Sequence, residues 1–191
     1  MVSVIIPVLN QERLIENCLK KLLEQNYPSD FLEIIAVDNG SKDKTLDIIK
    51  TFPVRLITEN KKGPSAARNT GIKAAQGEIL IFIDSDCVPD ANFVKFHVEA
   101  HNYHNNRDKK VKLIAGGIAG YNATLWACCD DVCSWYNSHP NLSPRYEYNA
   151  MPTANMSVPA DVIHEIGGFD EDIMGAEDIL FCCKAKDNGY R

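Results

Sequence analysis

The sequence predicts an α/β domain with a mostly parallel central sheet flanked by helices. Short apolar runs alternate along its first half with segments whose apolar residues recur at helical spacing. The runs at 2–8, 34–37 and 79–83 are rich in β-branched residues, and the intervening segments are long enough to hold crossover helices. Strands joined in this way form βαβ units, so most of the sheet is expected to be parallel.

Turn and helix-end signals separate these runs. Asn39 and Gly40 tolerate the left-handed backbone of a turn, Pro64 suits the first turn of a helix, and Gly77 ends that helix. After residue 110 the regular alternation of strands and helices gives way to a less periodic pattern. The predicted strands are 2–8, 34–37, 54–58, 79–83, 111–115 and 152–158, and the predicted helices are 14–23, 46–49, 64–77, 161–166 and 179–188.

Two carboxylates follow the apolar strand at 79–83. Asp84 and Asp86 stand where that strand emerges, which is the end of a parallel sheet where ligands bind. Residues two apart in an extended segment point the same way, so both carboxylates can approach one cation. One or two carboxylates with a diphosphate completing the shell is a usual arrangement for Mg²⁺. The alternative is an Asp-rich turn that continues through Pro89 and Asp90.

Length and charge exclude several classes of protein. At 191 residues the chain can bury a sizeable core, and one domain is expected. The formal net charge is −6 and no basic run is longer than a pair such as Lys109-Lys110, which disfavours nucleic-acid binding. No signal peptide and no apolar stretch of membrane-spanning length are evident, so we expect a cytoplasmic protein without a transmembrane segment.

The cysteines and histidines each admit a metal-site interpretation. Cys129 and Cys133 lie four residues apart, but no second pair completes a zinc site, so small buried hydrophobes are favoured. His97, His101 and His104 share one helical face. Their segment is rich in Asn, Lys and Asp, which favours a solvated helix face over a metal site.

The second half carries two further features that could act in catalysis. Residues 121–150 are rich in aromatic residues without clear periodicity, which fits either an acceptor-facing flap or a packed surface loop. Glu177 and Asp178 open the last predicted helix, where the helix dipole alone is a sufficient reason for acids. The functional interpretation is that one of these carboxylates accepts a proton from an incoming nucleophile.

Six short motifs occur in order along nearly the whole chain. Together they resemble the family 2 glycosyltransferases, inverting enzymes with a GT-A fold that use nucleotide-diphospho-sugars. The motifs are Pro7-x-x-Asn10-x-Glu12, Val37-Asp38-Asn39-Gly40-Ser41, Gly63-Pro64-x-x-Ala67-Arg68-Asn69-x-Gly71-Ile72, Asp84-x-Asp86, Gly167-Gly168-Phe169-Asp170 and Glu177-Asp178.

The resemblance implies roles for individual residues. Asp86, together with Asp84, would hold Mg²⁺ or Mn²⁺, which offsets charge on the departing diphosphate. Asp178 would act as the general base, with Glu177 as the second choice, and Gly168 and Phe169 would line the sugar pocket. The residues implied in nucleotide-sugar binding are Pro7, Asn10, Glu12, Asp38, Arg68, Asp84 and Ser85.

The resemblance also implies the organisation and the partners of the protein. Residues 1–191 would form one GT-A-like domain, with a nucleotide-binding half at 1–110 and an acceptor-side half at 111–191 that is incomplete at its C-terminus. The favoured donor is a UDP-sugar. The acceptor would be a glycan, a lipid-linked molecule or a cell-surface polysaccharide precursor, and peripheral association with the inner face of the membrane is left open.

Two alternatives to an active glycosyltransferase remain at this stage. One is a truncated or inactive module that binds a nucleotide-sugar without transferring it. The other is a nucleotidyltransferase, which would need a basic, glycine-rich triphosphate loop after the first strand. Residues 8–11 do not provide such a loop, so this alternative is the weaker one.

Overall fold

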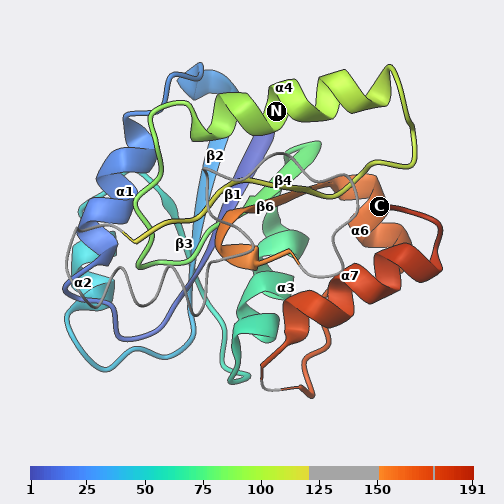
Figure 1. Cartoon of the computed structure of the whole chain (residues 1–191). Coiled ribbons are helices and arrows are strands. Elements are labelled where there is room, and N and C mark those ends of the chain that lie inside the picture. The colour runs from blue at the N-terminus through green and yellow to red at the C-terminus, as the bar shows by residue number, and fades with distance from the viewer. Residues whose placement is uncertain (121–150, 174) are drawn as a thin grey trace.

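The computed structural model describes residues 1–120, 151–173 and 175–191, and its centre is a six-stranded sheet in the order β3-β2-β1-β4-β6-β5. Figure 1 shows the helices on the two faces of this sheet. The strands are β1 (Val2–Val8), β2 (Leu32–Asp38), β3 (Arg55–Thr58), β4 (Ile79–Phe82), β5 (Ile114–Ala115) and β6 (Met156–Pro159). The helices are α1 (Ile15–Leu23), α2 (Thr45–Ile49), α3 (Pro64–Ala74), α4 (Phe93–Asn105), α6 (Ala160–Ile166) and α7 (Glu177–Asp187), with 3₁₀ turns η1 (Ser29–Phe31) and η2 (Thr153–Asn155).

The first four strands are parallel, which confirms the mostly parallel α/β sheet. β6 runs antiparallel to β4, and β5 runs antiparallel to β6. The last residue of β4, Phe82, therefore lies opposite the first residue of β6, Met156. We call this side of the sheet, where β1–β4 end and β6 begins, the carboxyl edge.

Two predicted strands are shorter than expected. The strand predicted at 111–115 is reduced to Ile114–Ala115, because the backbone N–H groups of Lys112 and Leu113 donate to the carbonyl of Arg191 instead of to β6. The strand predicted at 152–158 begins only at Met156, because residues 153–155 form the 3₁₀ turn η2.

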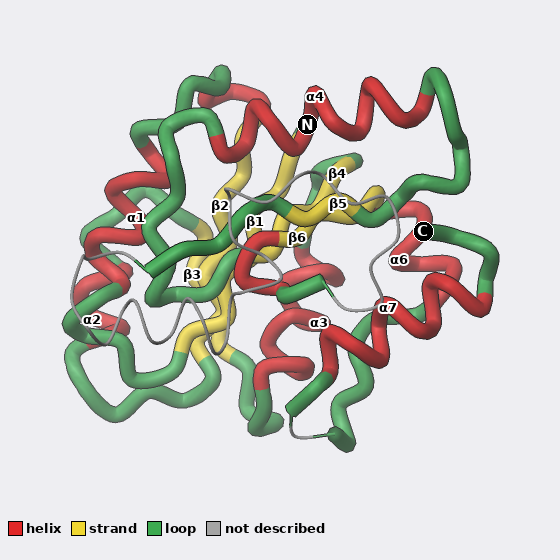
Figure 2. The backbone as a smooth tube through the Cα atoms, viewed as in Figure 1, coloured by secondary structure: helices red, strands yellow, loops and turns green. Residues whose placement is uncertain are grey.

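The two faces of the sheet bury separate apolar clusters, and the alternation of side chains in β1 supplies both. Val4 and Ile6 pack beneath α1, α2 and the start of α4, whereas Ile5 packs beneath α3, α6 and α7. In Figure 2 these two helix groups lie on opposite sides of the strands. Such alternation in a central strand lets one run of residues hold both helical layers.

Helix α3 approaches β1 closely because Gly71 has no side chain. A Cβ atom at this position would lie 2.4 Å from Cγ2 of Ile5, so a larger residue would push the helix away from the sheet. The same helix carries Arg68 one turn earlier. Close packing at Gly71 therefore positions Arg68 beside the carboxyl edge.

Candidate active site

The segment after β4 carries Asp84, Ser85 and Asp86 onto the carboxyl edge. Ile83 is still buried, the Asp84 side chain is 37% exposed, Ser85 is buried and Asp86 is exposed. The predicted position at the mouth of the fourth strand is therefore the observed one. Asp86 is close enough to Asp84 to contribute to raising its pKa.

Arg68 is the buried centre of this edge. Its Nη2 donates to Oδ1 of Asp84 at 2.9 Å and its Nη1 donates to Oε1 of Glu177 at 2.7 Å. The guanidinium carbon lies 5.7 Å from the centroid of the Phe169 ring, and the Arg68 side chain is only 4% exposed. Arg68 thus joins the end of β4 to the start of α7, with both terminal nitrogens engaged by carboxylates of the chain.

The ion pair with Arg68 does not fully compensate the negative charge around Asp84. Burial raises its pKa most, and the carboxylates of Asp86 and Glu177 raise it further, while Arg68 acts in the opposite direction. One guanidinium shared between two carboxylates leaves net negative charge at a partly desolvated site. A divalent cation would relieve that charge, and hard carboxylate oxygens suit Mg²⁺ or Mn²⁺.

The neighbouring thiol adds no soft ligand to this set. Burial and the carboxylates of Asp84 and Asp86 raise the pKa of Cys87 to about 12. The thiol therefore stays protonated and donates a weak hydrogen bond to Asp86 at 3.9 Å. Over the described ranges, no group of three or more His, Cys, Asp or Glu side chains is arranged to hold a metal. A cation here would take the rest of its shell from substrate and water.

The loop after β1 is held by the loop after β2. Asn10 adopts a left-handed backbone (φ 53°), donates its N–H to Oγ of Ser41 at 2.9 Å and accepts from the N–H of Lys42 at 2.8 Å. Glu12 accepts from the N–H of Lys44 at 3.1 Å. These side chains, predicted to line the nucleotide pocket, thus also shape the loop that would form it.

Pro7 and Asp38 end the two neighbouring strands. β1 pairs with β4 only as far as Ile5, so the missing N–H of Pro7 removes no ladder bond on that side. The Asp38 carboxylate is buried and accepts from the N–H groups of Gly40 and Ser41, at 2.9 and 3.2 Å. The turn therefore fixes the orientation of both Asp38 oxygens, and the predicted contact with a base stays a prediction.

Asn39 joins the loops after β2 and β3, a role that its place in the sequence did not reveal. Its Nδ2 donates to the carbonyls of Glu59 and Lys61, at 3.1 and 2.7 Å, and its Oδ1 accepts from the N–H of Gly63 at 2.8 Å. Gly63 is the N-cap of α3, the helix that carries Arg68. The only signal in the sequence was that Asn follows a strand and precedes Gly.

A similar contact explains the Gly-Gly-Phe turn. Oδ1 of Asn69 accepts from the N–H of Phe169 at 2.9 Å, and a Cβ atom at Gly168 would lie 2.3 Å from that oxygen. The expectation for Phe169 needs correction. We expected its side chain to line a sugar pocket, but it is 4% exposed. Its ring stacks on Phe181 and meets Phe82 edge-on, because it fills the space between the sheet and α7.

The start of α7 points its two acids in different directions. Ala176, the N-cap, has a left-handed backbone (φ 60°). Glu177 turns to Arg68 and its side chain is 12% exposed. Asp178 is half-buried, accepts from the N–H of Ile179 at 2.8 Å and lies within electrostatic range of Cys182. Of the two predicted bases, Asp178 is the one not engaged by a cation of the described chain.

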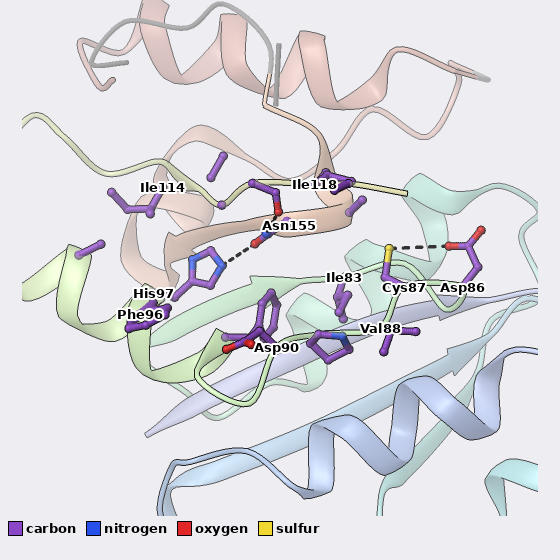
Figure 3. A pocket seen from close by; sticks show the side chains of 18 of the residues that line it. Ile83, Asp86, Cys87, Val88, Asp90, Phe96, His97, Ile114, Ile118 and Asn155 are labelled. Atoms are coloured by element: carbon purple, nitrogen blue, oxygen red, sulfur yellow. Dashed lines mark hydrogen bonds between the residues drawn. The ribbon is translucent and has the colours of Figure 1, made fainter. Parts of the chain in front are cut away.

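A pocket of about 650 Å³ opens beside Asp86. Residues 83–90 and α4 form one side of it, and residues 114–120 form the facing side, as Figure 3 shows. Its walls are largely apolar, and its polar side chains include Asp86, His97 and Asn155. The Trp- and Tyr-rich segment at 121–150, with Cys129 and Cys133, was predicted as a flap or packed loop; it lies outside the described residues.

The expectation for the histidines of α4 also needs correction. His97 and His101 were expected on a solvated face, but they are 4% and 2% exposed. They pack toward β6, where Ser157 supplies a hydrogen-bond partner to both rings. The polar residues around them in the sequence belong to the other faces of the helix, so composition averaged over the segment concealed the buried stripe.

Acidification is expected to destabilise the protein between pH 6.5 and 4. Burial lowers the pKa of His97 and of His101 from 6.5 to about 4, and the nearby His97, Lys112 and His104 lower the pKa of His101 further. The unfolded chain binds protons first as the pH falls, so the free energy of unfolding drops by on the order of 3 kcal/mol per histidine across this window.

Urea denaturation from pH 8 to 4 measures this slope. His97→Gln should reduce it, and His164→Leu, at an exposed histidine of α6, should not change it. An unchanged slope in His97→Gln would show that other groups govern the acid response.

Sequence comparison identifies the family. A family model described as glycosyl transferase family 2 matches residues 3–121, more than half of the chain. The chain belongs to this family. It is also 32% identical to the glycosyltransferase AglE of Haloferax volcanii over 197 aligned residues, which cover 99% of this chain and 62% of AglE.

Solved structures of family relatives share the fold. The mannosyltransferase PcManGT from Pyrobaculum calidifontis, in complex with GDP-Man and Mn²⁺, matches all of this chain with a TM-score of 0.76 and 25% identity. Staphylococcus aureus TarS 1-349 in complex with UDP-GlcNAc matches 96% of it with a TM-score of 0.73 and 23% identity. The chain spans 53% and 52% of these two structures. The predicted GT-A fold and family are confirmed.

A helix that crosses a bilayer must be long and apolar along its whole length. None of the helices in the described residues combines the length and the apolar character that crossing a membrane requires. No transmembrane helix was predicted from the sequence.

Proposed function

We propose that this chain is the catalytic domain of a glycosyltransferase that moves a sugar from a nucleotide-diphospho-sugar to an acceptor hydroxyl. The observation that carries the proposal is the Asp84–Asp86 pair at the carboxyl edge, charged beyond what Arg68 compensates, in a family 2 chain. Two relatives with the same fold support it: PcManGT holds GDP-Man and Mn²⁺, and TarS holds UDP-GlcNAc.

Asp86 and Asp84 would hold the Mg²⁺ or Mn²⁺ ion. Asp86 is exposed at the pocket, and Asp84 is held by Arg68 through one oxygen only. When bound, the ion supplies positive charge that stabilises the departing diphosphate. Arg68 opposes the rise in the pKa of Asp84 and orients its carboxylate, so that a buried ion pair directs the second carboxylate oxygen.

Asp178 would take the proton of the acceptor hydroxyl. The acceptor oxygen then forms its bond to the anomeric carbon while the bond from that carbon to the diphosphate breaks on the opposite face, which inverts the configuration. Glu177 is the poorer candidate because Arg68 already engages its carboxylate at 2.7 Å. The remaining proton acceptor at the start of α7 is therefore Asp178.

The donor and acceptor follow the earlier predictions. UDP-sugars are the favoured donors, with Pro7, Asn10, Glu12, Asp38 and Ser85 shaping the nucleotide end of the site. The acceptor is proposed to be a glycan or a lipid-linked molecule that serves as a polysaccharide precursor. The proposed location is the cytoplasm.

Metal-dependent nucleotide binding tests this function. Calorimetric titration of the chain with UDP and with GDP, each with Mn²⁺ or with EDTA, should show binding that requires the metal. Asp86→Ala should weaken the Mn²⁺-dependent affinity by at least about tenfold, because half of the protein's carboxylate ligands are lost. Asp47→Ala, at an exposed aspartate of α2, is the matched control.

The results separate the alternatives. Equal affinity in Asp86→Ala and the parent would remove the assigned metal ligand, and binding without Mn²⁺ would remove the metal dependence. If the parent binds nucleotide-sugars with Mn²⁺ but never hydrolyses or transfers them, the chain is a binding module and the catalytic proposal is wrong.

A further inference from the structure

Four polar side chains at one wall of the pocket, of which His97 and Asn155 line it, hydrogen-bond in series. His101 Nε2 lies 2.8 Å from Oγ of Ser157, and this oxygen lies 2.7 Å from Nδ1 of His97. His97 Nε2 lies 2.8 Å from Oδ1 of Asn155, whose Nδ2 donates to the carbonyl of Gly117 at 2.9 Å. The series runs from α4 through β6 and η2 to the 114–120 side of the pocket, and Figure 3 shows its His97–Asn155 link.

Burial lowers the pKa of both histidines to about 4, and with neutral rings the chemistry of the end groups fixes the direction of every bond. The Gly117 carbonyl can only accept, so the Asn155 amide must turn its nitrogen to Gly117 and its oxygen to His97. That oxygen also only accepts, so the proton of His97 sits on Nε2. A neutral imidazole then accepts at Nδ1, and Ser157 must be the donor there.

The proton of His101 is fixed in the same way. The single hydroxyl proton of Ser157 is used on His97, so the Ser157 oxygen accepts from His101 Nε2–H. His101 Nδ1 is then an unprotonated lone pair, and it is a buried atom without a hydrogen-bond partner in the described structure. An unpaired buried lone pair lowers stability less than an unpaired buried N–H group does. The unpartnered Nδ1 of His101 therefore fits this tautomer.

Both histidines must be neutral for this arrangement. A proton added to His97 Nδ1 would face an oxygen that already donates to it, and one added to His101 Nδ1 would have no acceptor. Burial lowers the pKa of each to about 4, and Lys112 and His104 disfavour a charge on His101. The four side chains are therefore uncharged at neutral pH, and the donor and acceptor of each hydrogen bond between them are fixed.

Asn155 forms two hydrogen bonds with the backbone of the pocket wall. Its carbonyl accepts from the N–H of Gly116 at 3.0 Å, and its side chain donates to the carbonyl of Gly117 at 2.9 Å. A Cβ atom at Gly116 would lie 2.3 Å from Asn155 Nδ2, so glycine is needed for this approach. Beyond this point residues 116–120 face the segment that bears Asp86 across the pocket.

We propose that the His101–Ser157–His97–Asn155 series sets the position of the 116–120 wall, and that His97 and Asn155 are positioning residues for the sugar of the donor. The assignment to the sugar rests on the proposed function, because the diphosphate would lie at Asp86 and the wall is on the opposite side of the same pocket. The positioning itself depends only on the hydrogen bonds and burial described above.

The first test measures the local stability of the pocket wall in the absence of ligand. Amide hydrogen exchange should be at least about tenfold faster over residues 114–120 in His97→Leu than in the parent, with β1 and β2 amides unchanged. His97→Gln should restore most of the protection, because its amide offers one donor and one acceptor as neutral histidine does. Asn155→Ala, at the half-buried end of the series, should match His97→Leu, and His164→Leu is the control.

The second test separates sugar from nucleotide. With the best donor among UDP-glucose, UDP-GlcNAc and GDP-mannose, His97→Leu and Asn155→Ala should raise KM for donor hydrolysis about tenfold and change kcat by less than about twofold. The affinity for the free nucleotide diphosphate with Mn²⁺ should stay at the parent value.

Each outcome decides one part of the proposal. Unchanged exchange at 114–120, or no rescue by His97→Gln, would overturn the positioning role. Faster exchange with an unchanged KM would overturn the link to the sugar. A parent chain that does not bind nucleotide with Mn²⁺ would overturn the proposed function and the sugar assignment, while the exchange result would still decide whether the series holds the wall.

Discussion

Replacing Asp178 with asparagine is expected to lower kcat by a factor of about 10²–10⁴ while the affinity for the nucleotide and Mn²⁺ stays at the parent value. The two side chains have nearly the same shape, so the hydrogen bond from the N–H of Ile179 can persist. What is lost is the ability to accept a proton from the attacking hydroxyl or water. The measurement is donor hydrolysis or transfer in a single turnover, with calorimetry for the nucleotide.

Glu177→Gln is the matched variant on the same helix turn. Glutamine keeps the shape of the Glu177 side chain, which Arg68 holds at 2.7 Å and which we do not assign as the proton acceptor. We expect Glu177→Gln to lower stability more than Asp178→Asn does, and to lower kcat far less. If Asp178→Asn turned over at nearly the parent rate while Glu177→Gln did not, the base would be Glu177 and the assignment would be wrong.

Replacing Arg68 with methionine should destabilise the fold by about 3–5 kcal/mol. Its guanidinium is buried between Asp84 and Glu177, and its removal leaves two carboxylates facing one another without a cation. Methionine retains much of the apolar stem, which limits the loss of packing against Phe169. Urea denaturation at pH 7 measures the change in the free energy of unfolding.

Two further variants isolate the charge effect. Arg55→Met removes a surface ion pair with Glu33, where the arginine side chain is 46% exposed, and the lost ion pair should cost less than about 1 kcal/mol. Adding Asp84→Asn and Glu177→Gln to Arg68→Met should recover part of the lost stability, because the uncompensated charges are removed together. A loss below about 1 kcal/mol in Arg68→Met alone would mean that the ion pairs do not hold this edge together.

The position of Asp84 and Asp86 could be predicted because its signal is local. Five apolar residues that end in Asp84-x-Asp86 specify a buried strand and the point at which it emerges, and both carboxylates are found there. The partners of Arg68 could not be predicted in the same way. Glu177 lies 109 residues further along the chain, and only the packing of α7 against α3 brings it within 2.7 Å.

The corrections share one physical cause. Phe169 and the histidines of α4 were placed from the character of their neighbours in the sequence, whereas their burial depends on which element lies over them. Phe181 of α7 covers Phe169, and Ser157 of β6 meets both His97 and His101. The short strand β5 has the same origin, since the backbone N–H groups of residues 112–113 donate to the carbonyl of Arg191 and not to β6.

The sequence by itself determined the order of strands and helices, the mostly parallel sheet, the family and the position of Asp84 and Asp86, because these depend on short-range periodicity and on residues that end a strand. Only the tertiary structure decided which carboxylates share Arg68, which side chains are buried, and how His101, Ser157, His97 and Asn155 connect. Those contacts join residues from 16 to 109 positions apart, and a hydrogen bond or an ion pair forms only where folding brings its two atoms within about 3 Å.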